Sequence, residues 1–264
     1  MNIRYISGAV ISFPLLPFMY FQGKRIRASV PKLPEAEGIE GHCSNQKSGN
    51  TLTVISIGES TIAGVGVRTH EEGFTGTFAK EISRLYNRSV QWKVYARSGY
   101  TAGSVDKKLI PEITENQADL IVIGLGGNDA FTLSRPSKWK ADIHSLIESL
   151  RSKFPKAIIV FCHMPPIKEF PAFTPLIKFT IGNLVEILGE ELRKVVSQYQ
   201  NVFYLGEKIT LKRWIDKFDL KAGKEDFFSD GVHPSKLTYQ TWAKDIAGGV
   251  FANENIKTAL QQSV

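Results

Sequence analysis

The sequence predicts an α/β fold in which a five-stranded parallel sheet is covered by helices on both faces. Five short runs of apolar and β-branched residues indicate strands, and the stretches between them repeat apolar residues at three- and four-residue intervals, as on one face of a helix. Strands that alternate with helices form a parallel sheet with right-handed crossovers. The composition agrees, because 42% hydrophobic and 22% charged residues are typical of a globular chain and exclude disorder.

The amino terminus, residues 1–27, carries an apolar run between basic residues. Residues 5–23 contain no charged side chain, and these 19 residues are just short of the ~20 that a membrane-spanning helix needs. Three interpretations are open: a short anchor or interfacial segment, an atypical signal peptide, and a strand-like arm packed on the domain. We therefore expect membrane association through residues 5–23, or a place in the cell envelope. The side of the membrane stays open because basic residues flank both ends.

Residues 28–50 are rich in Pro, Gly, Glu and Ser and lack apolar periodicity, which is typical of a linker. The predicted organisation is thus an apolar segment over 1–27, a linker over 28–50 and one folded domain over 51–264.

The formal net charge of +7 is concentrated near the amino terminus. Residues 1–32 hold five basic residues and no acidic one, which leaves 28 basic against 26 acidic residues in the rest of the chain. Nucleic-acid binding requires a basic patch on the folded domain, whereas this charge flanks an apolar run, so nucleic acid is not an expected partner. The two cysteines exclude a disulfide-rich scaffold.

The domain divides into strands and helices of ordinary length. Most of the predicted strands are continuous apolar runs, as expected when helices cover both faces of a sheet. They span residues 51–58, 89–96, 119–126, 157–162 and 201–205. The predicted helices span residues 73–87, 139–154, 175–199 and 235–251, the third with Pro at its start and the last capped by Ser235 or its neighbour.

Residues with catalytic chemistry follow these strands at the points where the strands end. Loops after the carboxyl ends of parallel strands gather at one edge of a sheet, where ligands bind. We therefore expect four groups of residues to meet there: GES at 58–60, RSGY at 97–100, GGND at 126–129 and SDGVHP at 229–234.

In this order the four groups resemble the SGNH/GDSL hydrolase family, whose name lists Ser, Gly, Asn and His from four successive blocks. The resemblance covers roughly residues 51–250. It implies a flavodoxin-like, three-layer α/β/α fold and hydrolysis of esters or thioesters through an acyl-enzyme. The first block of the family usually reads Gly-Asp-Ser, and this chain has Glu59 at the middle position.

The resemblance assigns a role to each matching residue. Ser60 is the nucleophile, and Asp230 and His233 complete the catalytic group. The backbone N–H groups of Ser60 and Gly99 and the side-chain amide of Asn128 form the oxyanion hole.

Elementary chemistry supports the same roles. A serine hydroxyl is a weak nucleophile until a neighbouring base takes its proton, and His233 supplies an imidazole that works near neutral pH. Asp230, three residues earlier, can hold that ring in one tautomer. The oxygen that becomes negative needs donors already in place.

Other chemistries lack their residues. Position 62 is Ile where an α/β-hydrolase elbow needs Gly, and no Lys follows the glycines at 64 and 66 as a P-loop requires. No histidine or cysteine pair has metal-ligand spacing, so we expect neither a metal nor a cofactor.

A Pro-rich apolar loop follows the fourth strand. Its side chains Phe170, Phe173 and Leu176 either line an acyl groove or plug the core above the sheet, and both interpretations are open. We expect a serine esterase or lipase acting on lipid-type or small acyl esters. The alternatives are a carbohydrate O-acetylesterase or acyltransferase with the same catalytic group, a catalytically inactive binding protein, and a flavodoxin-like cofactor binder.

Overall fold

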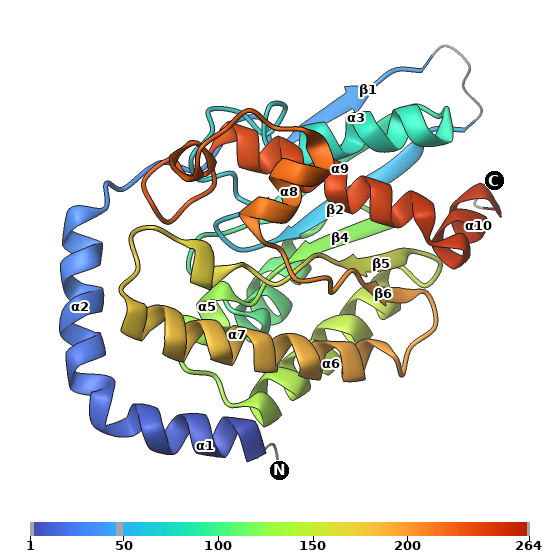
Figure 1. The fold of residues 1–264 in the computed structure, drawn as a ribbon. Coiled ribbons are helices and arrows are strands. Elements are labelled where there is room, and N and C mark those ends of the chain that lie inside the picture. The colour runs from blue at the N-terminus through green and yellow to red at the C-terminus, as the bar shows by residue number, and fades with distance from the viewer. Residues whose placement is uncertain (1–2, 46–49, 263–264) are drawn as a thin grey trace.

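A six-stranded sheet runs through the centre of the chain. In the computed structural model, which describes residues 3–45 and 50–262, its strands are β1 (Glu40–Cys43), β2 (Leu52–Gly58), β3 (Val90–Ala96), β4 (Leu120–Gly124), β5 (Ile158–Phe161) and β6 (Val202–Tyr204). They lie in the order β1-β3-β2-β4-β5-β6 (Figure 1). Residues 1–2 of the predicted N-terminal segment, 46–49 of the predicted linker and 263–264 at the carboxyl end lie outside the described residues.

The five predicted strands are confirmed as β2 to β6, and all of them pair in parallel. The strand count differs from the prediction, because β1 adds an antiparallel edge strand from within the segment expected to be a linker. A side chain at Gly41 would meet the indole of Trp92 at 2.3 Å, so glycine lets this backbone lie directly on the ring. The four residues of β1 show little alternation of apolar and polar side chains, so the sequence alone does not predict a strand there.

The helices cover both faces of the sheet, which confirms the three-layer architecture. All four predicted helices are present, as α3, α6, α7 and α9, and the hydroxyl of Ser235 caps the last one by accepting the N–H of Thr238. The α-helices are α1 (Ile3–Ser12), α2 (Leu16–Ser29), α3 (Phe74–Tyr86), α4 (Ala102–Ser104), α5 (Gly127–Phe131), α6 (Pro136–Lys153), α7 (Pro175–Val196), α8 (Leu211–Phe218), α9 (Lys236–Ala252) and α10 (Glu254–Gln262). Shorter turns are η1 (Phe13–Leu15), η2 (Val105–Leu109), η3 (Ile110–Glu112), η4 (Ile167–Glu169) and η5 (Lys224–Phe227).

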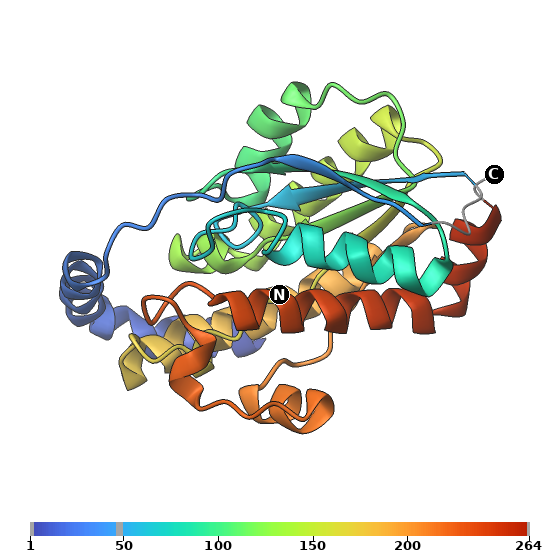
Figure 2. The ribbon, with the colours of Figure 1, turned by 90° about the horizontal axis from the view of Figure 1, so that it is seen from above.

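The core is divided by the sheet into two apolar clusters. Alternate side chains of a strand point to opposite faces, so Ile55 and Ile57 of β2 join one cluster and Val54 joins the other. The first cluster contains apolar residues of α6 and α7, and the second contains those of α3 and α9, which lie side by side in Figure 2. Both faces of the central strands are therefore dry, which explains their continuous apolar sequence.

The apolar N-terminal segment is helical from Ile3 to Ser29, so the structure does not show a strand-like arm. Its two helices, α1 and α2, run along the outside of the domain and meet at an angle (Figure 1). By length and composition, this is the one stretch among the described residues that could cross a membrane.

The carboxyl ends of β2, β3 and β4 lie level with one another. Gly58 is in register with Ala96 on one side and with Gly124 on the other. The loops that begin at residues 59, 97 and 125 therefore leave the sheet at the same edge, and this edge holds the predicted site.

Candidate active site

Ser60 lies in a tight turn directly after β2. The N–H of Glu59 still extends the sheet by donating to Gly124 O at 3.2 Å, and the N–H groups of Ile62 and Ala63 both donate to Glu59 O at 2.9 Å. The turn lifts Ser60 above the sheet edge, half-buried. Within the part of the chain that the structure describes, neither its N–H nor its hydroxyl donates a hydrogen bond.

Gly99 lies in the turn after β3 with a φ of +82°, a left-handed conformation that glycine adopts without strain. The N–H groups on either side of it are occupied: Ser98 donates to the Glu35 carboxylate at 2.7 Å, and Tyr100 donates to Arg97 O at 3.3 Å. Among residues 3–45 and 50–262, the N–H of Gly99 has no acceptor. One donor in this turn is therefore available to a ligand.

Asn128 lies in the first turn of α5, just after β4, and its side chain reaches the Gly99 turn. Its side-chain amide donates one N–H to Tyr100 O at 3.0 Å, which leaves the second N–H of the amide for another acceptor. The next residue, Asp129, is buried and accepts the N–H of Ala102 at 3.0 Å, where α4 begins. Two neighbouring side chains thus hold the loop that carries Gly99.

Glu59 joins the Ser60 turn to the Asn128 turn. Its carboxylate accepts the N–H of Gly127 through Oε1 and the N–H of Asn128 through Oε2, each at 2.8 Å. Burial raises the pKa of Glu59 to about 7, against the opposing effect of these two hydrogen bonds. The acidic position of the first block therefore has a defined partner in this chain, even though Glu replaces the Asp that is usual in the family.

Asp230 and His233 form a hydrogen-bonded pair in the loop before α9. His233 Nδ1 lies 2.7 Å from Asp230 Oδ2, while Asp230 Oδ1 accepts the backbone N–H groups of Val232 at 2.9 Å and His233 at 2.7 Å. Burial acts to raise the pKa of Asp230, but the hydrogen bonds from His233 and Val232 outweigh it and hold the pKa below its usual value. An ionised carboxylate that accepts the hydrogen bond of one ring nitrogen leaves the other ring nitrogen free to act as a base.

The loop of Asp230 and His233 is tied to the chain that follows Ser60. The Ser229 hydroxyl donates to Gly66 O at 3.1 Å, and the Tyr239 hydroxyl donates to Val65 O at 2.8 Å. These bonds join the segment that follows the first predicted group to Ser229 of the last group and to Tyr239 of α9. Within the described residues, no hydrogen bond links the Ser60 hydroxyl to the His233 ring, and such contacts often form only when substrate is bound.

The Pro-rich loop packs beside the catalytic loop. Phe170 and Phe173 are buried in the first core cluster, and Leu176 packs against it, half-buried. The Phe170 ring also contacts Phe228 at a centroid distance of 5.2 Å, and the N–H of Ala172 donates to Gly231 O at 3.1 Å. The two rings therefore contribute to the core beside the site, and an acyl groove stays a prediction.

Two hollows lie near this edge of the sheet. A cavity of about 170 Å³ between η4, α7 and the loop after β6 is lined by none of the predicted catalytic residues. Met164 forms part of its wall, and a Cβ at Gly126 would meet the Met164 methyl carbon at 2.4 Å, so the Met164 side chain also lies close to the glycines before Asn128. The second hollow borders the Gly99 turn, and its lining residues include Thr101, Thr132 and Arg135, whose polar groups lie within a mainly apolar surface.

Two residues, Glu35 and Tyr100, contribute contacts to the site although the sequence analysis gave them no role. Glu35 lies in the segment expected to be a linker, and nothing in its neighbourhood indicates that it contacts Ser98, 63 positions away. Tyr100 contributes only a backbone oxygen, for which no sequence signal exists. An acid beside a candidate nucleophile is a signal for Glu59, but its partners lie 68 and 69 positions along the chain.

A known protein family matches most of the predicted domain. A family described as GDSL-like lipase/acylhydrolase matches residues 56–241, a range that begins inside β2 and ends inside α9. The esterase TesA of Pseudomonas aeruginosa is 25% identical over 120 residues, which are 43% of this chain and 56% of that esterase. The match thus spans little more than half the length of this curated relative.

Solved structures share the fold at low identity. The lipase Lip_vut3 from a goat rumen metagenome covers 76% of this chain and 99% of its own, with a TM-score of 0.56 and 18% identity. A structure of TesA covers 79% of this chain and 98% of its own, with a TM-score of 0.54 and 18% identity. A carbohydrate esterase family 2 enzyme from Myceliophthora fergusii covers 88% of this chain and 69% of its own, with a TM-score of 0.55 and 14% identity.

Proposed function

This chain belongs to the GDSL-like lipase/acylhydrolase family and is a hydrolase that acts on ester bonds, and we propose that it works through an acyl-enzyme formed on Ser60. The observation that carries the proposal is the contact of 2.7 Å between His233 Nδ1 and Asp230 Oδ2. Because Nδ1 then holds a proton, Nε2 has a free lone pair and can accept the proton of a serine hydroxyl.

In the proposed mechanism the Ser60 oxygen attacks the acyl carbonyl carbon while His233 takes the hydroxyl proton. His233 then passes this proton to the leaving alcohol or thiol as the ester bond breaks, and Asp230 stabilises the charged ring. Water attacks the acyl-enzyme in the same way and releases the carboxylic acid with Ser60 restored.

The negative oxygen of the intermediate is held by donors on three loops. We assign this role to the N–H groups of Ser60 and Gly99 and to the second amide N–H of Asn128. The lack of any other acceptor for these groups among the described residues supports the assignment, because an oxyanion hole needs donors that are already in place and unoccupied.

For the substrate we propose lipid-type or small acyl esters, with Phe170, Phe173 and Leu176 beside the acyl chain. Hydrolysis of p-nitrophenyl esters from acetyl to palmitoyl tests this, because an apolar groove gives turnover that rises with chain length. A maximum at acetyl would exclude lipid-type esters and leave small acyl esters or the second candidate function.

That second candidate is deacetylation of carbohydrate, and the fold shared with the carbohydrate esterase from Myceliophthora fergusii favours it. In the hollow beside the Gly99 turn, the polar groups of Thr101, Ser134 and Arg135 are available for hydrogen bonds to a sugar. Release of acetate from acetylated saccharides, compared with release of fatty acid from lipid esters, distinguishes the two substrate classes.

A serine-directed fluorophosphonate tests the nucleophile. We expect the wild-type protein and the neighbouring control Ser98→Ala to be labelled, and Ser60→Ala to be unlabelled and inactive. An unlabelled wild type would point to an inactive binding protein, and labelling of Ser60→Ala would place the nucleophile elsewhere.

We further propose that the protein associates with a membrane through residues 5–23, with the catalytic domain in the aqueous phase beside it. The exposed apolar side chains of α1 and α2 support this, because a helix that only covers a domain presents polar residues to water.

A further inference from the structure

The N-terminal helical segment, Ile3–Ser29, is apolar on two sides. On its inner side the buried Met19 and the half-buried Tyr5, Leu16 and Ile26 pack against the first core cluster. These positions are separated by multiples of about one helical turn, so they form one stripe along the segment.

The outer side of the segment is apolar as well. Val10, Phe13, Phe18 and Phe21 are between 66% and 75% exposed, and Tyr20 lies among them with 68% exposed. The inner stripe already has its partner in the domain. The outer stripe therefore requires a second apolar surface, since exposed phenylalanines at this density are costly in water.

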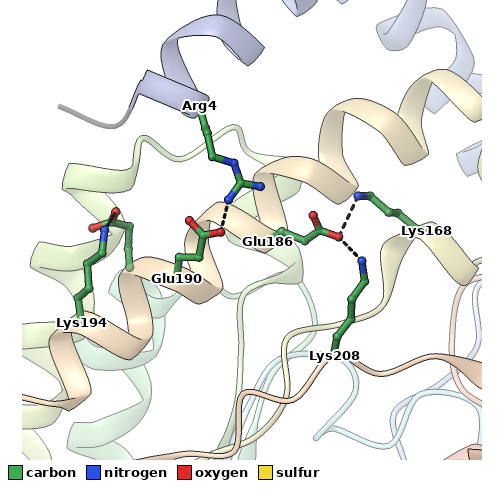
Figure 3. A network of polar contacts seen from close by, with 7 residues as sticks. Arg4, Lys168, Glu186, Glu190, Lys194 and Lys208 are labelled. Carbon is green, nitrogen blue, oxygen red and sulfur yellow. Dashed lines mark hydrogen bonds and ion pairs between the residues drawn. The ribbon is translucent and has the colours of Figure 1, made fainter. Parts of the chain in front are cut away.

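Contacts near both ends hold the segment on α7. Arg4 of α1 forms an ion pair with Glu190 on α7, one turn beyond Glu186, which pairs with Lys168 and Lys208 (Figure 3). Near the other end, the hydroxyl of Thr174 at the start of α7 donates to Gln22 Oε1 at 2.6 Å. The segment lies along the domain and is not attached by its end alone.

The shape of the segment does not suit a helix that crosses a bilayer. It turns at η1, which contains Pro14 and is followed by Pro17 in the first turn of α2, so α1 and α2 run in different directions (Figures 1 and 2). With 10 and 14 residues, the two helices are about 15 Å and 21 Å long at ~1.5 Å per residue, whereas the hydrocarbon core of a bilayer is ~30 Å thick.

The charges of the segment indicate which kind of apolar surface its outer side contacts. Residues 1–34 contain no Asp or Glu, and Lys24, Arg25 and Arg27 are exposed at the end of α2, directly beyond the aromatic side chains. Apolar side chains beside a cluster of basic ones are typical of helices that lie in the interface of a membrane with anionic lipids.

We propose that residues 3–29 stay docked on α7 and lie flat in the surface of an anionic bilayer, with Val10, Phe13, Phe18 and Phe21 among the lipids. The proposal rests on the membrane association proposed above and not on the identity of the nucleophile. The flat arrangement of the segment also places the catalytic group close to the lipid. Thr174, which holds Gln22, is two residues from Ala172, whose N–H bonds the loop of His233. An acyl ester in the bilayer surface therefore lies one short loop from the catalytic group.

The first test is co-flotation of the full chain with vesicles of phosphatidylcholine, with and without phosphatidylglycerol. Replacing Lys24, Arg25 and Arg27 together by Gln should weaken binding to the anionic vesicles on the order of 100-fold, since each basic residue near such a surface contributes about a factor of five. The matched control replaces the exposed Lys212, Lys221 and Lys244, on the other face of the sheet, and should bind as the wild type does. Equal binding of the two triple variants would overturn the proposal.

The second test locks the segment in its docked position. In a Cys43→Ser background, Arg4→Cys and Glu190→Cys are joined by a short, cleavable bis-maleimide. We expect the locked protein to bind anionic vesicles as well as the cleaved one, because binding requires no undocking. Loss of binding that returns on cleavage would show that the segment must leave α7 to insert, and would overturn the flat arrangement.

Hydrolysis of p-nitrophenyl acetate, a soluble ester, is measured in parallel for every variant. Binding without hydrolysis would count against the proposed catalytic group alone. If hydrolysis is normal but vesicle binding is unchanged in the variant without the three basic residues, the proposed membrane-binding surface is wrong and the catalytic group is not affected.

Discussion

Glu59 and Asn128 are joined through the backbone: Oε2 of the Glu59 carboxylate accepts the Asn128 N–H at 2.8 Å, while Oε1 accepts the preceding N–H of Gly127 at the same distance. Glu59 is also the residue before the proposed nucleophile. One buried carboxylate therefore sets the position of the Asn128 turn relative to the Ser60 turn. An error of about 1 Å between a nucleophile and an oxyanion donor is sufficient to slow catalysis strongly.

The Glu59→Gln variant tests this positioning. Glutamine keeps the size but presents an NH2 group to one of the two N–H donors, so one hydrogen bond is lost and the turn shifts. We expect kcat to fall about 10- to 100-fold with a smaller change in KM, as for the loss of one buried hydrogen bond to a charged group. Glu59→Asp, which restores the acid usual in the family, should recover part of the loss. An unchanged kcat in Glu59→Gln would remove Glu59 from the positioning of the site.

Asn128→Ala tests the oxyanion hole. The substitution removes the donor to the substrate and the bond to Tyr100 O, and we expect kcat to fall ~10²–10³-fold. Thr180→Val is the matched control, because the Thr180 hydroxyl donates only to the backbone oxygens of Leu176 and Ile177 within α7. If both variants lost activity equally, the amide of Asn128 would have no special role.

Asp230→Asn tests the orientation of the base. The amide cannot accept the Nδ1 proton and two backbone N–H groups as the carboxylate does, and kcat should fall by about 10⁴ as in other serine hydrolases. Because the pKa of Asp230 is lowered, its contribution to stability is present above its unfolded value of 3.8 and is lost only as the pH falls through the lower folded value. The loss of stability that Asp230 causes should therefore begin only below pH 3.8 and should be absent in Asp230→Asn, which urea unfolding of both proteins across that range checks.

Glu35→Ala tests the link between the segment before β1 and the Gly99 turn. Without the carboxylate, the N–H of Ser98 loses its acceptor, the turn is less well held, and we expect kcat to fall about tenfold. Glu35→Gln keeps an acceptor oxygen and should restore most of the activity. Glu37→Ala, two residues further on, is the matched control and should resemble the wild type. A loss in Glu37→Ala as large as that in Glu35→Ala would indicate a general effect on this segment.

His70 makes the stability of the fold depend on pH. Burial lowers the pKa of His70 to about 4, against the opposing effect of Glu35. Between that value and about 6.5 the unfolded chain binds the proton and the folded chain does not, so acidification through this range should lower the free energy of unfolding by a few kcal/mol at most. The raised pKa of Glu59 acts with the opposite sign, because the folded chain holds its proton up to about 7 and loses stability as the pH rises.

Urea unfolding at several pH values distinguishes the contribution of His70 to the free energy of unfolding from that of Glu59. In His70→Gln the fall in stability on acidification should be smaller than in the wild type, whatever the stability of the variant at neutral pH. Curves that stay parallel from pH 6.5 to 4 would exclude His70 as the source.

The parallel sheet could be predicted from the sequence because its signals are local, and the catalytic group remains a prediction that rests on equally local signals. Apolar runs such as 119–126 and helical spacing such as that of Phe74 and Phe78 depend only on neighbours in the chain. The chemistry of Ser60, Asn128 and His233 is likewise carried by residue types at the ends of strands, and the order of strands and helices limits the topology to few choices.

Contacts between distant residues were decided only by the tertiary structure. β1 exists because Gly41 fits against the Trp92 ring, and Glu35 and Glu59 have roles because folding brings Ser98 and Asn128 to them. The apolar run of residues 5–23 indicated a membrane without indicating how it lies. Arg4 and Gln22 hold this run along α7, and their partners, Glu190 and Thr174, are more than 150 positions away. Such pairings depend on the complete packing of the chain, so local sequence patterns contain no signal for them.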